Sequence, residues 1–360
     1  MIGIIGAGPT GLAIAYLLKK RGVDFQILER ESVGHTWKNQ YESLRLNSLR
    51  DASSLPGMRM PKSYPIFPPA TQFVSYLEQY AKEFELPIQK AEVREIKFTK
   101  SGFEARTDAG SHYYQTIVIA TGIWSRPHHP YAYSSPFSGQ VLHASEYRTA
   151  DPFAGKRVLV VGSGSSAGDI AVDLGASAAF VGMSIAHGVN IIAPITSATV
   201  FKIFRAIFES ATLFKLIQPV LVKIRQDYSS IGLPTHPLAD TQIGYSVIPG
   251  DKLVNAVKAG KVSVFPAFRN FTAGGAVFTD QHEVGFDAII FATGYRPALD
   301  FARNCFEMDS DGCPVLDRCR STKYKNLYFA GPGRNYEHNV GWLPSLAKIA
   351  KAVVNEIAPA

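Results

Sequence analysis

The chain has 360 residues, 46% hydrophobic and 19% charged, a composition typical of a globular protein with more than one core. Its formal charge is +7, but no cluster of lysine and arginine accompanies that charge, so we expect no nucleic-acid partner. No run of about 18 uncharged apolar residues exists and the chain opens directly on an apolar strand, so we expect neither a transmembrane span nor a signal peptide, and a cytoplasmic protein.

The first thirty residues have the pattern of a dinucleotide-binding βαβ unit. Ile2–Ile5 is a short apolar run, a helix is predicted from about Thr10 to Arg21, and Val23–Leu28 is predicted as the next strand, followed by Glu29. Between the first strand and the helix, residues 6–11 read G-A-G-P-T-G. The spacing and its context predict a loop that holds a pyrophosphate at the start of the helix.

Each glycine of this loop is expected to have a different structural role. Gly6 permits the tight turn, Gly8 lets the backbone approach the pyrophosphate, and Gly11 lets the helix pack closely on the strand. Glu29 is placed to accept hydrogen bonds from a ribose. The dinucleotide contacts expected here come from Gly6, Gly8, Pro9, Thr10, Gly11 and Glu29.

Residues 31–70 are polar, aromatic and rich in proline, so they are predicted to be mostly loop. A helix is predicted over about Thr71 to Phe84, and strands follow near 92–106 and 113–120. A second cycle then begins at Lys156.

The second cycle repeats the first motif 156 residues later. Val158–Val161 is predicted as a strand, and residues 162–169 read G-S-G-S-S-A-G-D and open a helix, with alanine in the third glycine position, an accepted variant. We expect a second dinucleotide to contact Gly162, Gly164, Ser165, Ser166 and Ala167.

The kind of dinucleotide is set by the strand that follows, predicted at Ala178–Val181 and ending near Gly182-Met183-Ser184. An acid there would favour NADH and an arginine would favour NADPH; neither is present, so the choice stays open.

Farther along, residues 198–228 have apolar side chains at helical spacing. This amphipathic pattern fits a helix that covers an active-site cleft, or a helix that contacts a membrane surface peripherally. Strands are predicted at Phe286–Ala292 and Leu327–Ala330, and the last helix at about Pro344 to Ile357.

Residues 137–148, F-S-G-Q-V-L-H-A-S-E-Y-R, lie between the two glycine loops and resemble the F-x-G-x-x-x-H-x-x-x-[YF]-[KR] signature of flavin-containing monooxygenases, the class B flavoprotein monooxygenases. The Baeyer–Villiger branch is similar but usually has tryptophan where Tyr147 stands. The A-T-G segments at 120–122 and 292–294 resemble the family's linker motifs, and residues 34–37 its G-x-x-W segment. The layout is most similar to short bacterial members and plant YUCCA-type enzymes.

The resemblance implies FAD at the first glycine loop, also contacted by Trp37, Thr121 and Gly122, and NADPH, with NADH as the alternative, at the second loop and Thr293. It implies that reduced flavin adds O2, and that a C4a-hydroperoxyflavin delivers one oxygen atom to a small organic substrate. In this family the motif around His143 is a structural link between domains, with a base role for His143 as the alternative. A plain core position is the alternative for Trp37.

Asn47 is the candidate catalytic residue, because the matching asparagine in relatives hydrogen-bonds near the flavin and the nicotinamide. A turn-capping asparagine is the alternative, and YUCCA-type members tend to have histidine there.

The fold class predicted is α/β, with two nested Rossmann-like three-layer domains arranged as in disulfide reductases. The FAD-binding domain is expected to use residues 1–150 and 286–360, with the NAD(P)H-binding domain at 151–285; a homodimer is left open.

Three alternative functions remain. One is a flavin oxidoreductase or oxidase without oxygen insertion, and another is a non-catalytic flavin-binding protein. The third, a disulfide reductase, needs a redox-active cysteine near the flavin, and Cys305, Cys313 and Cys319 lie in the wrong segment. Their spacing matches neither a zinc ribbon nor a C-x-x-C redox pair, and no metal is expected.

Overall fold

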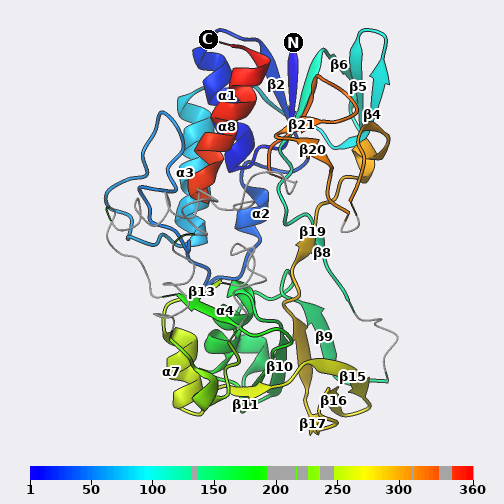
Figure 1. The fold of residues 1–360 in the computed structure, drawn as a ribbon. Helices are drawn as coiled ribbons and strands as arrows, with labels where there is room; N and C mark the ends of the chain where they lie inside the picture. Colours follow the sequence, from blue (N-terminus) through cyan, green and yellow to red (C-terminus); the bar gives the residue numbers. More distant parts are fainter. Residues whose placement is uncertain are drawn as a thin grey trace. The chain divides into compact units, whose positions relative to one another are not determined.

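The computed structural model describes residues 1–130, 136–192, 199, 216, 226–235, 247–309, 312–331 and 343–359. It divides into two compact units (Figure 1). The first unit consists of Met1–Asn39, Arg45–Arg126 and Tyr295–Ala360, and the second of Gln40–Leu44 and Pro127–Gly294. The second unit is therefore inserted into the chain of the first, which is the nested arrangement expected.

The first unit is built on a seven-stranded sheet whose central strands are parallel. In sheet order the strands are β20 (Leu316–Asp317), β21 (Arg320–Ser321), β22 (Leu327–Phe329), β7 (Thr116–Ile119), β1 (Ile2–Ile5), β2 (Phe25–Glu29) and β3 (Ile88–Lys90). All four residues of β1 are buried, as expected of a central parallel strand covered on both faces.

Helices and an antiparallel meander form the outer layers of this unit. The helices are α1 (Pro9–Lys20), α2 (His35–Lys38), α3 (Ala70–Glu83) and α8 (Leu343–Ile357). The meander consists of β4 (Val93–Thr99), β5 (Gly102–Thr107) and β6 (Gly110–Tyr114), and Figure 1 shows it on the side of the sheet away from α1 and α8. Ile96 and Phe103 of the meander share a buried core with Ile5, Ile117 and Ile119 of the sheet.

The second unit has a five-stranded, fully parallel sheet. In sheet order its strands are β14 (Ser263–Phe265), β11 (Phe180–Ser184), β10 (Arg157–Val161), β18 (Ala288–Phe291) and β9 (Gln140–His143). Val158 and Val160 pack in one core with α4 (Ser165–Leu174) and α7 (Lys252–Lys258), while Leu159 and Val161 join a second core. That second core includes the antiparallel strands β15 (Phe268–Thr272), β16 (Gly275–Phe278) and β17 (Glu283–Gly285). Side chains thus alternate between two covering layers, as the pleat of a strand requires.

The remaining described elements are short strands and 3-10 helices. These are β8 (Arg126–Pro127), β12 (Asn190–Ile192), β13 (Val247–Pro249), β19 (Tyr295–Arg296) and the 3-10 helices η1 (Asp151–Phe153), η2 (Ser229–Ile231) and η4 (Asp300–Cys305).

The α/β fold class with two Rossmann-like domains is confirmed, with differences in detail. The second unit begins before residue 150 and extends past residue 285, because β9 and β18 are strands of its sheet. The helix expected at 198–228 lies mostly outside the described residues. Within the described part, no helix combines the length and apolar character needed to cross a membrane.

Candidate functional site

A cavity of about 340 Å³ opens at the carboxyl ends of β1, β2 and β7 in the first unit. Most of the FAD contacts expected from the sequence line it: Gly6, Gly8, Pro9, Thr10, Glu29, Trp37, Thr121 and Gly122. The carboxyl ends of parallel strands are where nucleotide cofactors bind in folds of this class.

The three glycines of the first loop have distinct surroundings. Gly6 has a φ of +106°, and a Cβ there would lie 2.7 Å from the carbonyl oxygen of Ala120. A Cβ on Gly11 would collide with the carbonyl oxygen of Gly6, so Gly11 serves helix packing and does not line the cavity. Around Gly8 no atom of the described residues, apart from its neighbours in the chain, lies within 4 Å of an added Cβ. Gly8 therefore leaves open the space beside the first turn of α1, where a pyrophosphate would be held.

The carboxylate of Glu29 is held at the loop by two backbone groups. The amide of Ala7 donates to Glu29 Oε2 at 2.7 Å, and the amide of Glu31 donates to Oε1 at 3.0 Å. A carboxylate has further lone pairs, and Glu29 lines the cavity, so it can also accept hydrogen bonds from ribose hydroxyl groups.

The other end of the cavity is aromatic. Trp37 is 9% exposed, and its ring lies 4.8 Å from that of Phe73 and 4.9 Å from that of Trp124, both edge to face. Trp124 also lines the cavity, and the sequence analysis did not identify it. Its position two residues after the A-T-G motif was the available signal.

Thr121 carries a buried hydroxyl group without a hydrogen-bond partner in the described part of the chain. An unsatisfied buried polar atom is costly, and a polar ligand in the cavity that it lines would satisfy it. The open space at Gly8, the anchored carboxylate of Glu29 and the Thr121 hydroxyl, which lacks a partner in the part of the chain that is described, together fit a dinucleotide such as FAD.

The second glycine loop repeats the geometry of the first. The amide of Gly6 donates to the carbonyl oxygen of Leu28 at 2.8 Å, and the amide of Gly162 donates to that of Ser184 at 3.0 Å. Gly162 has a φ of +148°, and an added Cβ would collide with the carbonyl oxygen of Ala292. Gly164 precedes the first turn of α4, which contains the expected contacts Ser165, Ser166 and Ala167.

This register corrects the expected position of nicotinamide recognition. Strand β11 runs to Ser184, so Met183 lies inside the strand and is fully buried, instead of standing at its end. The counterpart of Glu29 is Ile185, which is 3% exposed. Ala186 and His187 follow and are exposed.

The hydroxyl group of Thr293 donates to the carbonyl oxygen of His128 at 2.6 Å. Its nicotinamide contact, like those of the second loop, stays a prediction.

His143 ties the signature segment to the second A-T-G segment. It is fully buried, and the amide of Ser145 donates to Nδ1 at 3.1 Å, so Nε2 carries the proton and donates to the carbonyl oxygen of Gly294 at 3.1 Å. Burial, reinforced by His129, lowers the pKa of His143 to about 4. An imidazole that is neutral and makes hydrogen bonds through both ring nitrogens supports a structural role for His143.

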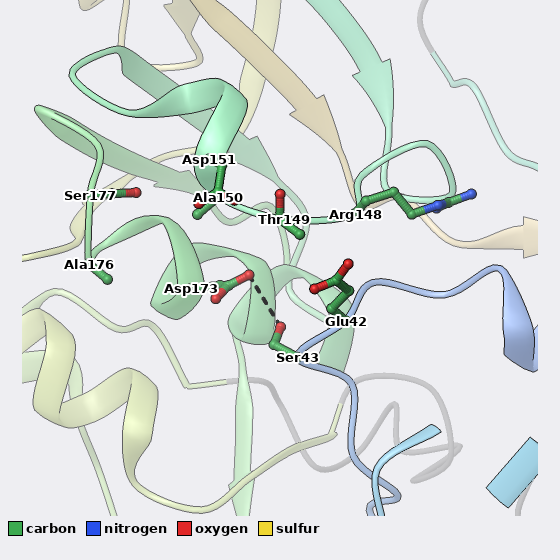
Figure 2. Close-up of a pocket in the computed structure, with 9 residues that line it drawn as sticks. All are labelled: Glu42, Ser43, Arg148, Thr149, Ala150, Asp151, Asp173, Ala176 and Ser177. Atoms are coloured by element: carbon green, nitrogen blue, oxygen red, sulfur yellow. Dashed lines mark hydrogen bonds between the residues drawn. The ribbon is translucent and has the colours of Figure 1, made fainter. Parts of the chain in front are cut away.

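Tyr147, also in the signature segment, donates to Asp173 Oδ2 at 2.8 Å. Ser43 donates to the same oxygen at 3.3 Å, as Figure 2 shows beside a polar cavity of about 460 Å³. The signature thus fastens the C-terminal half of α4.

Asn47 lies on a bend and its side chain is exposed. It is not among the described residues that line the cavity of the first unit, and its catalytic role stays a prediction. Among the cysteines, Cys305 and Cys319 are buried and Cys313 is half-buried; none lines the described part of that cavity.

Residues 3–211 match the family described as pyridine nucleotide-disulphide oxidoreductase. An indole-3-pyruvate monooxygenase, YUCCA8, from Oryza sativa subsp. indica is 31% identical over 317 residues, covering 81% of this chain and 75% of its own. An uncharacterised CzcO-like oxidoreductase from Geobacillus kaustophilus is 29% identical over 358 residues, covering 98% and 97%. A solved flavin monooxygenase variant from Stenotrophomonas maltophilia has the same fold, with a TM-score of 0.81, 23% identity and coverage of 99% and 97%.

Proposed function

We propose that this chain, which belongs to the flavin-containing monooxygenase family, is an FAD-dependent enzyme that consumes NAD(P)H and inserts one oxygen atom of O2 into a small organic substrate. The cavity of the first unit carries the proposal, because it combines the open space beside Gly8, the anchored carboxylate of Glu29 and a buried Thr121 hydroxyl with no partner among the described residues. The monooxygenase activity named for the YUCCA8 relative supports the class of reaction.

In this proposal the first loop holds the FAD pyrophosphate. The backbone at Gly8 and the first turn of α1 present N–H groups to it, Glu29 accepts from the ribose, and Thr121 donates to a cofactor oxygen. When bound there, FAD would supply the redox chemistry, with electrons from NAD(P)H, and the activation of O2.

Trp37 and Trp124 are proposed to shield the flavin from water. Trp37 and Trp124 pack edge to face in the cavity wall, and their apolar surfaces exclude water from the flavin. Exclusion of water favours oxygen transfer over release of H2O2.

The nicotinamide cofactor is proposed to bind at the second loop, with its pyrophosphate at the first turn of α4. Gly162, Gly164, Ser165, Ser166 and Ala167 would surround it, with Thr293 beyond. Ile185 provides no carboxylate at the ribose position, so NADPH is not repelled and NADH is not specifically selected.

The test is product analysis of the FAD-loaded protein with NADPH and O2 over a panel of sulfides, amines, ketones and 2-oxo acids. An oxygenated product with one oxygen atom from ¹⁸O2 is the expected result. NADPH oxidation with H2O2 as the sole product for every substrate would instead identify an oxidase. A FAD-loaded protein without NADPH-driven oxygen uptake would identify a non-catalytic flavoprotein.

A further inference from the structure

Five residues, Gln40–Leu44, belong to the second unit although the residues on both sides of them belong to the first. We call this segment the strap. Tyr41 is 2% exposed and lies in the core that Val158 and Val160 form with α4 and α7. Leu44 packs against the same core. The amide of Glu42 donates to the carbonyl oxygen of Arg148 at 3.0 Å. The strap is therefore an integral part of this unit.

Side chains of the strap donate hydrogen bonds to α4. Tyr41 donates from its hydroxyl group to Asp169 Oδ2 at 2.8 Å, and Ser43 donates to Asp173 Oδ2 at 3.3 Å. Asp173 keeps a second donor in Tyr147, which lies 2.8 Å away. The Tyr41 bond is the shorter of the two strap bonds and is made by the more deeply buried side chain.

The two aspartates differ in their distance from the phosphate-binding end of α4. Asp169 is the fifth residue of the helix, about 6 Å along the axis from its start, whereas Asp173 lies about 12 Å along. Burial raises the pKa of Asp169, while the hydrogen bond from Tyr41 and the charge of Lys252 on α7 act in the opposite direction. A negative charge on Asp169 would also weaken the positive electrostatic potential at the N-terminus of α4, which attracts phosphates.

The helix α4 is also packed tightly at Gly168, the residue before Asp169. A Cβ added to Gly168 would lie 3.0 Å from the side chain of Ile248. Tyr41 and Ile248 belong to the same buried core as Ala167 of α4, so both side chains pack where the first turns of the helix are buried.

We propose that Tyr41 and Asp169 are positioning residues for the nicotinamide dinucleotide. Their hydrogen bond fixes the first turns of α4, so that the N–H groups at Ser165 and Ser166 point to the pyrophosphate. This rests on the proposed function, in which the second loop binds NAD(P)H.

The experiment titrates the FAD-loaded protein with NADP⁺ by calorimetry and measures anaerobic reduction over a range of NADPH concentrations. Tyr41→Phe removes only the hydroxyl group. We expect Kd for NADP⁺ to rise about five- to tenfold, part of the effect of one hydrogen bond to a charged group. The limiting rate of reduction at saturating NADPH and the FAD content should stay within about twofold of the parent.

Two further variants separate positioning from stability. Asp169→Asn keeps an acceptor for Tyr41 and removes the charge, so affinity should equal or exceed that of the parent, whereas Asp169→Ala should weaken binding as Tyr41→Phe does. Ser43→Ala is the matched control on the same strap, because Asp173 retains Tyr147, and its Kd should change less than about twofold.

Equal Kd values for the parent and Tyr41→Phe would overturn the inference, as would equal weakening by Tyr41→Phe and Ser43→Ala. If Tyr41→Phe does not fold, the comparison of Asp169→Asn with Asp169→Ala decides in the same way. A parent protein that holds FAD but binds neither NADP⁺ nor NAD⁺ would contradict the proposed function itself, and the inference with it.

Discussion

Glu29 and Ile185 occupy the same position in the two units, one residue after the carbonyl group that accepts the first amide of the glycine loop. Glu29 accepts a hydrogen bond from the backbone of its loop at 2.7 Å, whereas Ile185 is apolar and 3% exposed. The acid that would select a ribose diol in the second unit is therefore missing.

The enzyme should accordingly discriminate only weakly between NADPH and NADH. We expect kcat/KM for NADPH and NADH to agree within about 30-fold, which corresponds to about 2 kcal/mol. His187→Arg adds a guanidinium two residues beyond Ile185 and should raise the preference for NADPH by about tenfold through contact with the 2′-phosphate. Met183→Leu, a change inside the core, should leave the preference unaltered. A thousandfold preference in the parent protein would mean that another segment recognises the ribose.

The glycines of the first loop should separate cofactor binding from folding. Gly8→Val places its side chain in open space, so the protein should fold with the parent's stability in the absence of cofactor but contain no FAD. Gly11→Ala forces its Cβ into the carbonyl oxygen of Gly6 and should lower the free energy of unfolding by about 1–3 kcal/mol. Flavin absorbance and thermal unfolding measure both effects. A yellow, fully loaded Gly8→Val protein would refute the assigned use of the loop.

Local sequence patterns predicted most of the first unit's framework. The loop between β1 and α1, and the acid at the end of β2, follow from spacing alone, because a glycine loop between a buried strand and a helix is a local pattern. The end of β11 could not be placed in this way: Gly182-Met183-Ser184 has the composition of a turn, yet it pairs with β10 and β14 as strand.

The strap and the aromatic wall were missed for a different reason. Tyr41 meets Asp169, 128 positions away in the chain, and Trp124 meets Trp37 across 87 positions (124 minus 37). A motif can single out one member of such a pair, as it did for Trp37, but a single sequence contains no signal that the two residues meet.

Thr121 and Thr293 follow corresponding strands but use their hydroxyl groups differently. Thr121→Val removes a hydroxyl that has no described partner, so the cofactor-free protein should not lose stability, while FAD should bind about five- to tenfold more weakly. Thr293→Val breaks the hydrogen bond to His128 and should lower the free energy of unfolding by about 1 kcal/mol without changing FAD affinity. Fluorescence titration with FAD and urea unfolding test the pair. Equal FAD affinity in Thr121→Val and the parent would mean that the hydroxyl does not contact the cofactor.

His143 should make stability depend on pH on the acid side. Its pKa falls from 6.5 to about 4 in the folded protein, so the unfolded chain binds more protons between these values. Its contribution is therefore complete above pH 6.5 and is lost as the pH falls toward 4, by up to about 2 kcal/mol at pH 4.5. His143→Gln can still donate to Gly294 but does not titrate. Its thermal midpoint should fall less than the parent's between pH 7 and 4.5, and parallel curves would exclude this source of acid sensitivity.

Asn47 should matter for coupling more than for flavin reduction. Its amide is exposed in this structure and is predicted to hold the oxygen-reacting centre once both cofactors are bound. Reduction needs only stacked rings and the two glycine loops, so Asn47→Ala should reduce its flavin with NADPH anaerobically at close to the parent rate. One lost hydrogen bond to a strongly polarised group corresponds to about 1.5–3 kcal/mol, so peroxide release should quicken by about ten- to a hundredfold.

The measurement is H2O2 formed per NADPH consumed, with and without an accepted substrate. Ser48→Ala is the neighbouring control, because its hydroxyl is buried against Ser53, 2.6 Å away, and should affect stability without affecting coupling. If Asn47→Ala keeps its FAD and forms no more peroxide than the parent, Asn47 is a turn residue. Other residues would then have to protect the oxygenating centre. Trp37 and Trp124, which line the cavity, would be the next residues to substitute.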